Sequence, residues 1–243
     1  MGHTRDNQDE AGRGSLLRAD NLHKAYHLRK VRIDVLCGAS LEVAEGETVA
    51  VVGASGAGKS TLMHVLGGLD RPDAGRVVVQ GRDVYALSPG RRSRLRCLSI
   101  GFVFQSYHLL PEMDVLENVA LPAMARPGGA GPGARARAEA LLDGVGLADR
   151  RNHRPMELSG GEQQRAAIAR AMMNEPPLVL ADEPTGNLDE KTGDKVLEAL
   201  FSMTRARGHA LVIVTHSAHV AGLCGRTLAL RDGVMDVEAS GSP

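Results

Sequence analysis

Short runs of apolar residues recur along the chain, and each run ends at a glycine or at a polar side chain. The runs occupy residues 48–52, 101–104, 178–181 and 210–215. Uninterrupted apolar runs of this length are typical of strands that are buried on both faces of a parallel sheet. Because such sheets bind ligands at the carboxyl ends of their strands, we expect an α/β fold whose functional residues lie where these runs end.

Other segments alternate between apolar and polar positions, as strands with one solvent-facing side do. Residues 16–26 and 31–43 alternate in this way, and we expect them to form an antiparallel β-layer beside the parallel core. Towards the other end of the chain, residues 226–231 and 234–238 flank an Asp-Gly pair at 232–233. An Asp-Gly pair between two apolar stretches predicts a β-hairpin.

The segment from residue 105 to about residue 170 has a helical pattern. Asp114 and Glu117 have the spacing of a capping box and precede an apolar run, so a helix is expected to begin there. A second helix is expected over residues 134–142. The glycine- and proline-rich residues 127–133 between the two predict a loop.

The run at 48–52 ends in a segment that fits the pattern G-x-x-x-x-G-K-[ST] and precedes an expected helix over 61–66. The glycines let successive backbone N–H groups and the helix N-terminus point at phosphate oxygens. In this arrangement Lys59 reaches the β and γ phosphates of ATP, and Ser60 binds Mg²⁺. A glycine-rich turn that merely joins a strand to a helix is the alternative. The expected nucleotide-binding residues are Gly53, Ala54, Ser55, Gly56, Ala57, Gly58, Lys59, Ser60 and Thr61.

Two adjacent carboxylates, Asp182 and Glu183, follow the apolar run at 178–181. Asp182 is placed to hold Mg²⁺, and Glu183 to orient or deprotonate the water that attacks the γ-phosphate. A helix cap or solvated loop charges are the alternatives. The expected phosphate site favours the catalytic interpretation because such a site needs carboxylates at the same edge of the sheet.

A second glycine pair lies shortly before this strand, in the segment Leu158, Ser159, Gly160, Gly161 and Glu162. Ser159 and Glu162 have the spacing of a capping box, so a well-capped helix is the simple interpretation. Capping does not require glycines in the first turn, because each costs about 1 kcal/mol relative to alanine in a helix. The glycines are explained if a phosphate must approach bare backbone.

The P-loop, the Asp-Glu pair and this second motif together resemble the ATP-binding cassette (ABC) ATPases. The resemblance implies a P-loop NTPase fold with a parallel core sheet, an N-terminal antiparallel β-layer and an inserted helical subdomain at about 106–172. The ATPase domain is expected at 15–238. Residues 1–14 are polar and charged and contain glycine, which predicts a disordered tail, and residues 239–243 are expected to form a second tail. Gln163 and Gln164 depart from the more usual Glu or Arg followed by Gln, and Ala54 stands where Pro or Ser is common.

Single residues of the family can also be matched to this chain. Gln105 resembles the Q-loop glutamine that contacts Mg²⁺ and water, and His216 resembles the switch histidine that contacts the γ-phosphate. Asp189 lies in a segment that resembles the D-loop, and Tyr26 is the candidate for stacking on adenine. Each has an ordinary structural alternative: a polar strand end for Gln105, a boundary residue for His216, an Asx turn for Asp189 and an exposed strand aromatic for Tyr26.

In ABC ATPases the second motif of one subunit covers the ATP held by the P-loop of the other. The resemblance therefore implies a head-to-tail homodimer with two ATP molecules and Mg²⁺ at its interface. It also implies two integral membrane permease subunits, which dock near the helical subdomain. The formal net charge of zero gives no indication of a basic surface that would favour nucleic acid as a partner.

Composition agrees with a cytosolic enzyme at a membrane surface. The 243 residues can bury a large core, and no stretch approaches the roughly 20 apolar residues of a membrane span. We therefore expect a protein that is soluble by itself, without a secretory signal at its start. The three cysteines have no CxxC spacing, which argues against zinc and disulfides and predicts small buried or half-buried side chains.

The segments 108–122, 67–72 and 180–189 resemble the group of lipoprotein-releasing and macrolide-exporting ABC ATPases. The resemblance implies an ATPase at the cytoplasmic face of the inner membrane that draws lipoproteins towards a periplasmic carrier. A macrolide-type exporter ATPase and a cell-division ATPase share several of these features and stay open as alternatives. A soluble ABC ATPase acting on DNA or ribosomes is disfavoured because the chain has no coiled coil, zinc pair or second cassette. A simple P-loop kinase is also disfavoured, because such an enzyme would not need the second motif.

Overall fold

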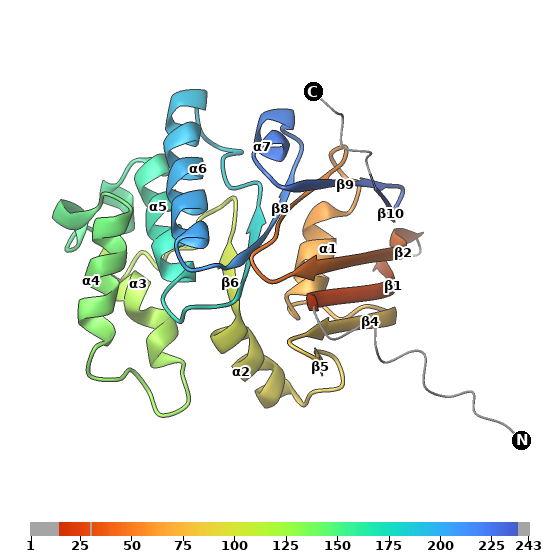
Figure 1. The fold of residues 1–243 in the computed structure, drawn as a ribbon, viewed down its shortest axis with the longest axis horizontal. Coiled ribbons are helices and arrows are strands. Elements are labelled where there is room, and N and C mark those ends of the chain that lie inside the picture. The colour runs from red at the N-terminus through yellow and green to blue at the C-terminus, as the bar shows by residue number, and fades with distance from the viewer. Residues whose placement is uncertain (1–14, 30, 238–243) are drawn as a thin grey trace, which may run out of the picture.

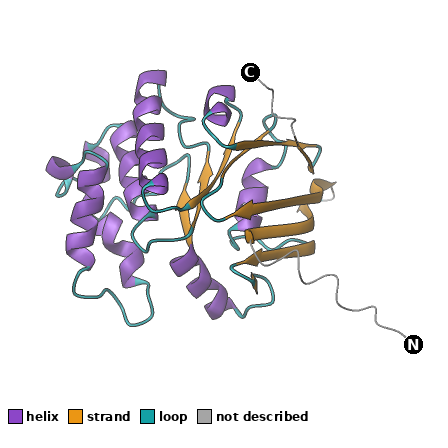
Figure 2. Cartoon of the chain, in the orientation of Figure 1, coloured by secondary structure: helices purple, strands orange, loops and turns teal. Residues whose placement is uncertain are grey.

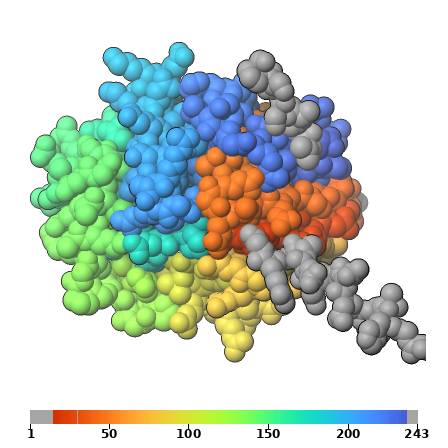
Figure 3. Space-filling view, in the orientation of Figure 1, coloured from red at the N-terminus to blue at the C-terminus, as the bar shows by residue number. Residues whose placement is uncertain are grey.

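The computed structural model describes residues 15–29 and 31–237 as two sheets and a group of helices (Figure 1). The predicted tails at 1–14 and 239–243 lie outside these residues. The antiparallel strands lie at one end of the molecule and most of the helices at the other, with the parallel strands between them (Figure 2). In the space-filling view the green helical end and the red-orange strand end form one continuous body (Figure 3).

The larger sheet has the order β10-β9-β3-β8-β7-β6. Neighbouring strands run parallel except at the antiparallel β9–β10 hairpin, so the parallel core and the hairpin are both confirmed. The four apolar runs become adjacent strands in an order that differs from their order in the sequence. Their bounds are β3 Thr48–Val52, β6 Ile100–Val103, β7 Leu178–Asp182, β8 Ala210–Thr215, β9 Arg226–Arg231 and β10 Val234–Val237.

The smaller sheet has the order β2-β1-β4-β5, and its pairs are antiparallel. The expected β-layer is thereby confirmed, with β1 at Ser15–Leu28 and β2 at Val31–Ala44. The sequence pattern did not indicate β4, at Ala74–Val79, or the two-residue β5, at Arg82–Asp83. β4 adds a further strand on the other side of β1, so that β1 is paired along both of its edges.

Helix α1 follows the P-loop, and α3, α4, α5 and α6 lie together at the helical end (Figure 1). The capping box of Asp114 and Glu117 begins α3, as its spacing predicts, and both of its hydrogen bonds form. The helices α2, α6 and α7 were not predicted. The bounds are α1 Lys59–Leu66, α2 Pro89–Ser99, α3 Val115–Met124, α4 Ala134–Gly144, α5 Gly160–Ala171, α6 Glu190–Arg205 and α7 Ala218–Gly222, with short 3-10 turns η2 at Ala148–Arg150 and η3 at Pro155–Glu157.

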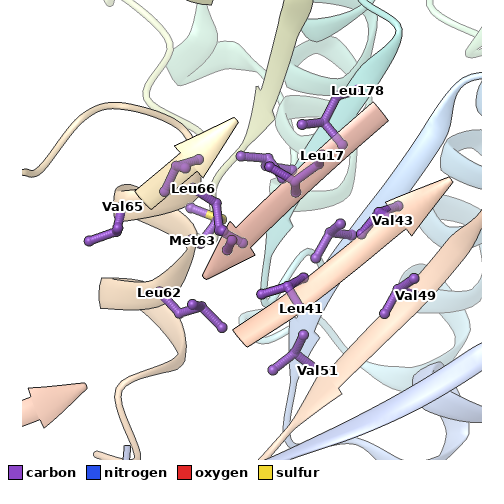
Figure 4. Close-up of a cluster of buried hydrophobic side chains, with 14 of the residues drawn as sticks. Leu17, Leu41, Val43, Val49, Val51, Leu62, Met63, Val65, Leu66 and Leu178 are labelled. Atoms are coloured by element: carbon purple, nitrogen blue, oxygen red, sulfur yellow. The ribbon is translucent and has the colours of Figure 1, made fainter. Parts of the chain in front are cut away.

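Helix α1 packs its apolar side chains into the main core between the two sheets (Figure 4). Leu62, Met63, Val65 and Leu66 are fully buried there with side chains of both sheets. Each such side chain contributes on the order of 1.5–3 kcal/mol through burial. The segment that begins α1 is therefore fixed to the framework of the protein rather than to a free loop.

A second core lies among the helices and the other face of β7 and β8. It includes residues of α3, α4, α5 and α6, so the predicted subdomain at 106–172 shares its core with elements that follow it in the chain. No helix among the described residues has both the length and the apolar character needed to cross a bilayer. Cys37, Cys97 and Cys224 are free; Cys97 and Cys224 are partly buried as expected, whereas the prediction of burial was wrong for Cys37, which is exposed on β2.

Candidate functional site

The carboxyl ends of β3, β6, β7 and β8 meet at one edge of the larger sheet. The P-loop follows β3, Glu183 follows β7, and His216 follows β8. These segments surround a pocket of about 640 Å³. Every lining residue except Val35 belongs to the predicted set, and the lining consists of Tyr26, Val35, Ser55, Gly56, Gly58, Lys59, Ser60, Thr61, Gln105, Glu183 and His216. The pocket thus unites residues from the first strand of the chain and from the loop after β8.

Two P-loop glycines have conformations or surroundings that exclude a side chain. Gly58 is the N-cap of α1 in the left-handed region, with φ 95°, and a Cβ there would lie 2.9 Å from Val35. A Cβ on Gly53 would lie 2.5 Å from the carbonyl oxygen of Leu230. The loop is therefore shaped by bare backbone, and its N–H groups precede the N-terminus of a helix, where anions are stabilised.

The Lys59 side chain is buried, and its ammonium lies inside the curl of the P-loop. Its Nζ donates hydrogen bonds to the carbonyl oxygens of Gly53, at 2.9 Å, and Ala54, at 3.1 Å. The ammonium also lies 3.9 Å from Oε1 of Glu183. A buried ammonium that is held by main-chain carbonyls can exchange these partners for the stronger, charged acceptors of a phosphate.

Glu183 lines the pocket, and its carboxylate contacts Thr215 and His216 at the end of β8. Its Oε2 accepts a hydrogen bond from the hydroxyl of Thr215 at 3.1 Å, and its Oε1 lies 2.8 Å from Nδ1 of His216. The backbone of Glu183 has φ 42°, which is uncommon for a residue with a side chain, and its N–H donates to the carbonyl of Val214 at 2.9 Å. Strained residues of this kind cluster at functional sites, where the surrounding structure holds them in place.

Asp182 ends β7 next to Ser60. Burial raises the pKa of the Asp182 carboxyl, and a hydrogen bond from the Ser60 hydroxyl partly opposes that rise. The carboxylate oxygen Oδ1 is buried and has no hydrogen-bond partner among the described residues. An orphaned carboxylate oxygen beside a serine hydroxyl is an arrangement of hard oxygen ligands that suits Mg²⁺.

Gln105 and Asn187 form a reciprocal pair of hydrogen bonds beside the pocket. Nε2 of Gln105 donates to Oδ1 of Asn187, and Nδ2 of Asn187 donates to the carbonyl oxygen of Gln105, both at 3.1 Å. The segment after β6 is therefore joined to the segment after Glu183. A pattern of residue types cannot reveal this contact, because the two partners are 82 positions apart.

Tyr26 contributes to the pocket from β1, with 40% of its surface exposed. Its hydroxyl donates a 2.7 Å hydrogen bond to Oδ2 of Asp70. The ring is thus held from its hydroxyl end while it lines the pocket. Sequence reasoning found Tyr26 but missed the role of Asp70, which belongs to the loop after α1 and carries no phosphate-binding motif.

The second glycine motif lies outside this pocket, at the N-terminus of α5. None of the residues 158–162 lines the pocket. Ser159 and Glu162 form a complete capping box, and Arg150 pairs with the Glu162 carboxylate at 3.2 Å. The backbone N–H and hydroxyl of Ser159 lower the pKa of Glu162 by hydrogen bonding to its ionised form. The helix terminus thus does not contribute to the pocket of its own chain.

Contacts within the chain also explain why both positions of this motif are glycine. A Cβ on Gly161 would lie 2.3 Å from Cγ2 of Thr192, and a Cβ on Gly160 would lie 2.8 Å from the hydroxyl of Tyr107. The inference that these glycines must admit a phosphate is therefore incomplete, because close packing against α6 and the segment after Gln105 excludes side chains as well. Sequence reasoning could not separate the two causes.

Two further residues of this region form hydrogen bonds within the same chain. Asp189 is the N-cap of α6, where its carboxylate accepts the N–H of Thr192 at 3.1 Å. Gln164 is fully buried, and its Nε2 donates to the carbonyl oxygen of Pro184 at 2.8 Å. Gln164 therefore links α5 to the segment that follows Glu183.

Comparison with known proteins agrees with this arrangement. The family model described as ABC transporter matches residues 36–186. The lipoprotein-releasing system ATP-binding protein LolD of Geobacter metallireducens is 55% identical over 90% of this chain and 97% of its own length. The LolD protein of Xanthomonas campestris pv. campestris is 51% identical over 96% of this chain and 95% of its own length. A solved dimeric, post-hydrolysis structure of the ATP-binding cassette MJ0796 with ADP and Pi has a TM-score of 0.84 and 38% identity, and covers 92% of this chain and 99% of its own.

These likenesses extend over most of the chain rather than over the P-loop alone. The expectations of an ABC cassette fold and of an ATP-hydrolysing enzyme are confirmed. Together with the pocket at the sheet edge, they establish that the chain belongs to the ABC transporter family, as an ATP-binding cassette with ATPase chemistry.

Proposed function

We propose that this chain is the ATP-hydrolysing subunit of an ABC transporter that releases lipoproteins from the cytoplasmic membrane. The observation that supports it most strongly is the pocket in which Lys59, Glu183 and His216 converge from the ends of three strands. The cargo is inferred from the relatives of the chain, the LolD proteins of lipoprotein-releasing systems, which match it over most of its length.

The pocket suits a nucleoside triphosphate held from both ends. The P-loop N–H groups and Lys59 bind the β and γ phosphates at the start of α1, where the helix dipole favours negative charge. Tyr26 supplies an aromatic face for adenine elsewhere in the pocket. Ser55, Ala57 and Thr61 belong to the same phosphate cradle.

The oxygen ligands beside the P-loop fit a magnesium ion. Ser60 and Asp182 would hold it, with Gln105 as a further oxygen ligand, and the unpartnered Oδ1 of Asp182 supports this assignment. When bound, Mg²⁺ neutralises charge on the phosphate oxygens of the substrate. Ser60 follows Lys59 at the start of α1, and Asp182 ends β7, so both side chains lie at the edge of the sheet that carries the P-loop.

Glu183 orients or deprotonates the water that attacks the γ-phosphate. Its carboxylate is held on one side by Thr215 and on the other by His216, so it cannot rotate freely. His216, which is largely exposed, lies beside this carboxylate and contacts the γ-phosphate. Lys59 moves from the main-chain carbonyls to the phosphate, since the charged acceptor is stronger.

The second motif completes the site of a second copy. Ser159 and the N-terminus of α5 lie outside the chain's own pocket but have helix N–H groups of the kind that bind phosphate. A head-to-tail homodimer would bring this terminus over the ATP of the partner, with Asp189 near the same interface. The MJ0796 structures are described as dimeric, and they support this assembly.

The membrane subunits dock in a groove at the junction of the sheet and the helical subdomain. A largely apolar groove of about 450 Å³ lies there between α2, β6, α3 and α5, and Phe102, Phe104 and Leu121 are among its lining residues. In each copy of the homodimer, a short coupling helix from one of the two permease subunits would fill this groove. Gln105 directly follows Phe104, so movement in the groove reaches the nucleotide pocket. A chain docked in this way would lie at the cytoplasmic face of the inner membrane.

Replacing Glu183 by glutamine tests the ATPase proposal. We expect turnover to fall by at least about 100-fold, while ATP binding persists and an ATP-dependent dimer accumulates in size-exclusion chromatography with light scattering. Glu139→Gln makes the same chemical change on α4, beside the exposed Arg135, and should leave turnover unchanged. Normal hydrolysis by the Glu183 variant would remove this residue from the catalytic role.

The transport proposal needs a separate experiment. The chain should co-purify with membrane proteins that have few spans and large periplasmic domains, and the reconstituted complex should release lipoproteins from proteoliposomes only with hydrolysable ATP. Release of a macrolide instead would indicate the exporter alternative. A complex that hydrolyses ATP but moves neither substrate would indicate a cell-division role.

A further inference from the structure

Asp70 connects the strand that presents Tyr26 to the helix that begins at the P-loop. One carboxylate oxygen accepts the Tyr26 hydroxyl at 2.7 Å, and the other accepts the Lys24 ammonium at 2.8 Å. The Lys24 ammonium also donates to the carbonyl oxygen of Arg71 at 2.8 Å. Two side chains of β1 are therefore held by one carboxylate of the loop that follows α1.

The main chain of Asp70 is itself fixed to α1. Its N–H donates to the carbonyl of His64 at 3.2 Å, and its carbonyl accepts the hydroxyl of Tyr85, which also donates to the carbonyl of Val65 at 2.6 Å. Through Asp70, the Tyr26 hydroxyl is thus tied to the C-terminal end of α1, the helix whose first residue is Lys59.

Both charges of the bridge are present at neutral pH. Burial would raise the pKa of Asp70, but the hydrogen bonds from Lys24 and Tyr26 outweigh it and hold this pKa below its usual value. Burial would likewise lower the pKa of Lys24, and the Asp70 carboxylate outweighs that effect, so this pKa is raised. Tyr26 donates its proton to an ionised carboxylate, a bond that is roughly twice as strong as one between neutral groups.

The Lys24 ammonium also limits which part of the ring is free. It lies over the Tyr26 ring, 5.1 Å from the centroid, but is not among the residues that line the pocket. The ring therefore has one side occupied by the cation, whereas another part of it faces the pocket. A ring with its hydroxyl tethered and one face covered can meet a base in few orientations.

We propose that Asp70 is a positioning residue for base recognition, which sets the distance between the stacking ring of Tyr26 and the phosphate-binding P-loop. The inference rests on the proposed function of this pocket as an ATP site. Asp70 does not line the pocket; it acts through Tyr26 by tying β1 to α1. Asp70 therefore contributes to binding of the base and not of the phosphates, because the phosphates bind at the opposite end of α1.

Binding measurements with and without a base test this inference. The probes are ATP and inorganic tripolyphosphate, each measured by competition against a fluorescent ATP analogue. For Asp70→Ala we expect the Kd for ATP to rise about three- to tenfold, as for the loss of one hydrogen bond, with the Kd for tripolyphosphate within about twofold of the original. The KM for ATP should rise with little change in kcat. Asp70→Asn keeps the shape of the side chain, and its Kd for ATP should lie between those of the original protein and of Asp70→Ala. This variant replaces Asp70→Ala in the test if the alanine variant does not fold.

Two tyrosine variants separate this inference from the proposed function. Tyr26→Phe should weaken ATP binding by no more than Asp70→Ala, which also releases Lys24. Adding Tyr26→Phe to Asp70→Ala should have no further effect, since the bond between the two side chains is already lost. Tyr26→Ala should weaken it further. An unchanged Kd for Tyr26→Ala would mean that the stacking role itself is wrong. A weakened Tyr26→Ala with an unchanged Asp70→Ala would refute only the role of Asp70.

A matched control comes from the same strand. Asp20 forms an ion pair with Arg18 at 2.8 Å on β1 and does not line the pocket. Asp20→Ala should leave both dissociation constants unchanged. If Asp70→Ala weakened ATP and tripolyphosphate equally, the bridge would be a general stabiliser of the fold, and the inference would be overturned.

Discussion

The packing of Gly161 against Thr192 gives a prediction that separates the two reasons for a glycine in the second motif. A Cβ at position 161 would lie 2.3 Å from Cγ2 of Thr192, a distance that real Cβ contacts do not reach. Alanine at this helical position would gain about 1 kcal/mol in helix propensity. Overpacking of this kind costs about 1–3 kcal/mol, so Gly161→Ala should lower the free energy of unfolding by up to about 2 kcal/mol.

Removing the opposing methyl group should reverse the effect. Thr192→Ser deletes Cγ2 and keeps the hydroxyl and the backbone N–H that Asp189 binds. Alone it should cost about 0.8 kcal/mol, the value of one buried carbon. In the double variant the new methyl group at position 161 occupies the vacated space, so stability should return to that of the original protein or slightly exceed it. The coupling energy between the two sites would then be about 1–3 kcal/mol.

Urea unfolding of the original protein, the two single variants and the double variant measures this coupling. Gly90→Ala is the control. Gly90 lies in α2, where no described atom outside its chain neighbours and its own helix backbone comes within 4 Å of the position that a Cβ would take, and the variant should gain up to about 1 kcal/mol. Additive effects at 161 and 192 would refute the packing explanation. Because the added methyl points into the protein, we expect ATPase activity to return with stability; stability without activity would mean that the bound phosphate also requires glycine here.

Two further predictions concern local anchors. Asn118 is fully buried and bonds to the N–H and carbonyl of Leu110, so Asn118→Ala should cost about 1–3 kcal/mol in urea unfolding, against no measurable change for the exposed Asn152→Ala. The pKa of Glu162 is lowered in the folded state. The original protein should therefore be more stable than Glu162→Gln by about 1 kcal/mol above about pH 5–6, and this difference should vanish as the pH falls through the lowered pKa. A difference that stays constant between about pH 7 and pH 3 would contradict the role of the ionised carboxylate.

Sequence patterns predicted many of the elements whose structure depends on neighbours in the chain. The apolar runs became β3, β6, β7 and β8, and the capping boxes at Asp114 and Ser159 formed as their spacing predicts. The helices α2, α6 and α7 were not predicted. The sequence of α2 is rich in charged and polar residues, whereas α6 has apolar residues at helical spacing behind the capping Asp189, so its pattern was sufficient to predict it. The helix α6 is stabilised by the second core, which only the assembled fold provides.

The chemistry of this protein can be deduced from the order of its residues: which groups bind phosphate, which carboxylates follow the strands, and which family the motifs resemble. How these groups are held depends on the folded chain. The bond from Tyr26 to Asp70, the pair of Gln105 and Asn187, and the contact of Gly161 with Thr192 join residues that no local pattern connects. Periodicity and spacing encode backbone conformation over a few turns, whereas these contacts depend on the order in which strands and helices pack together.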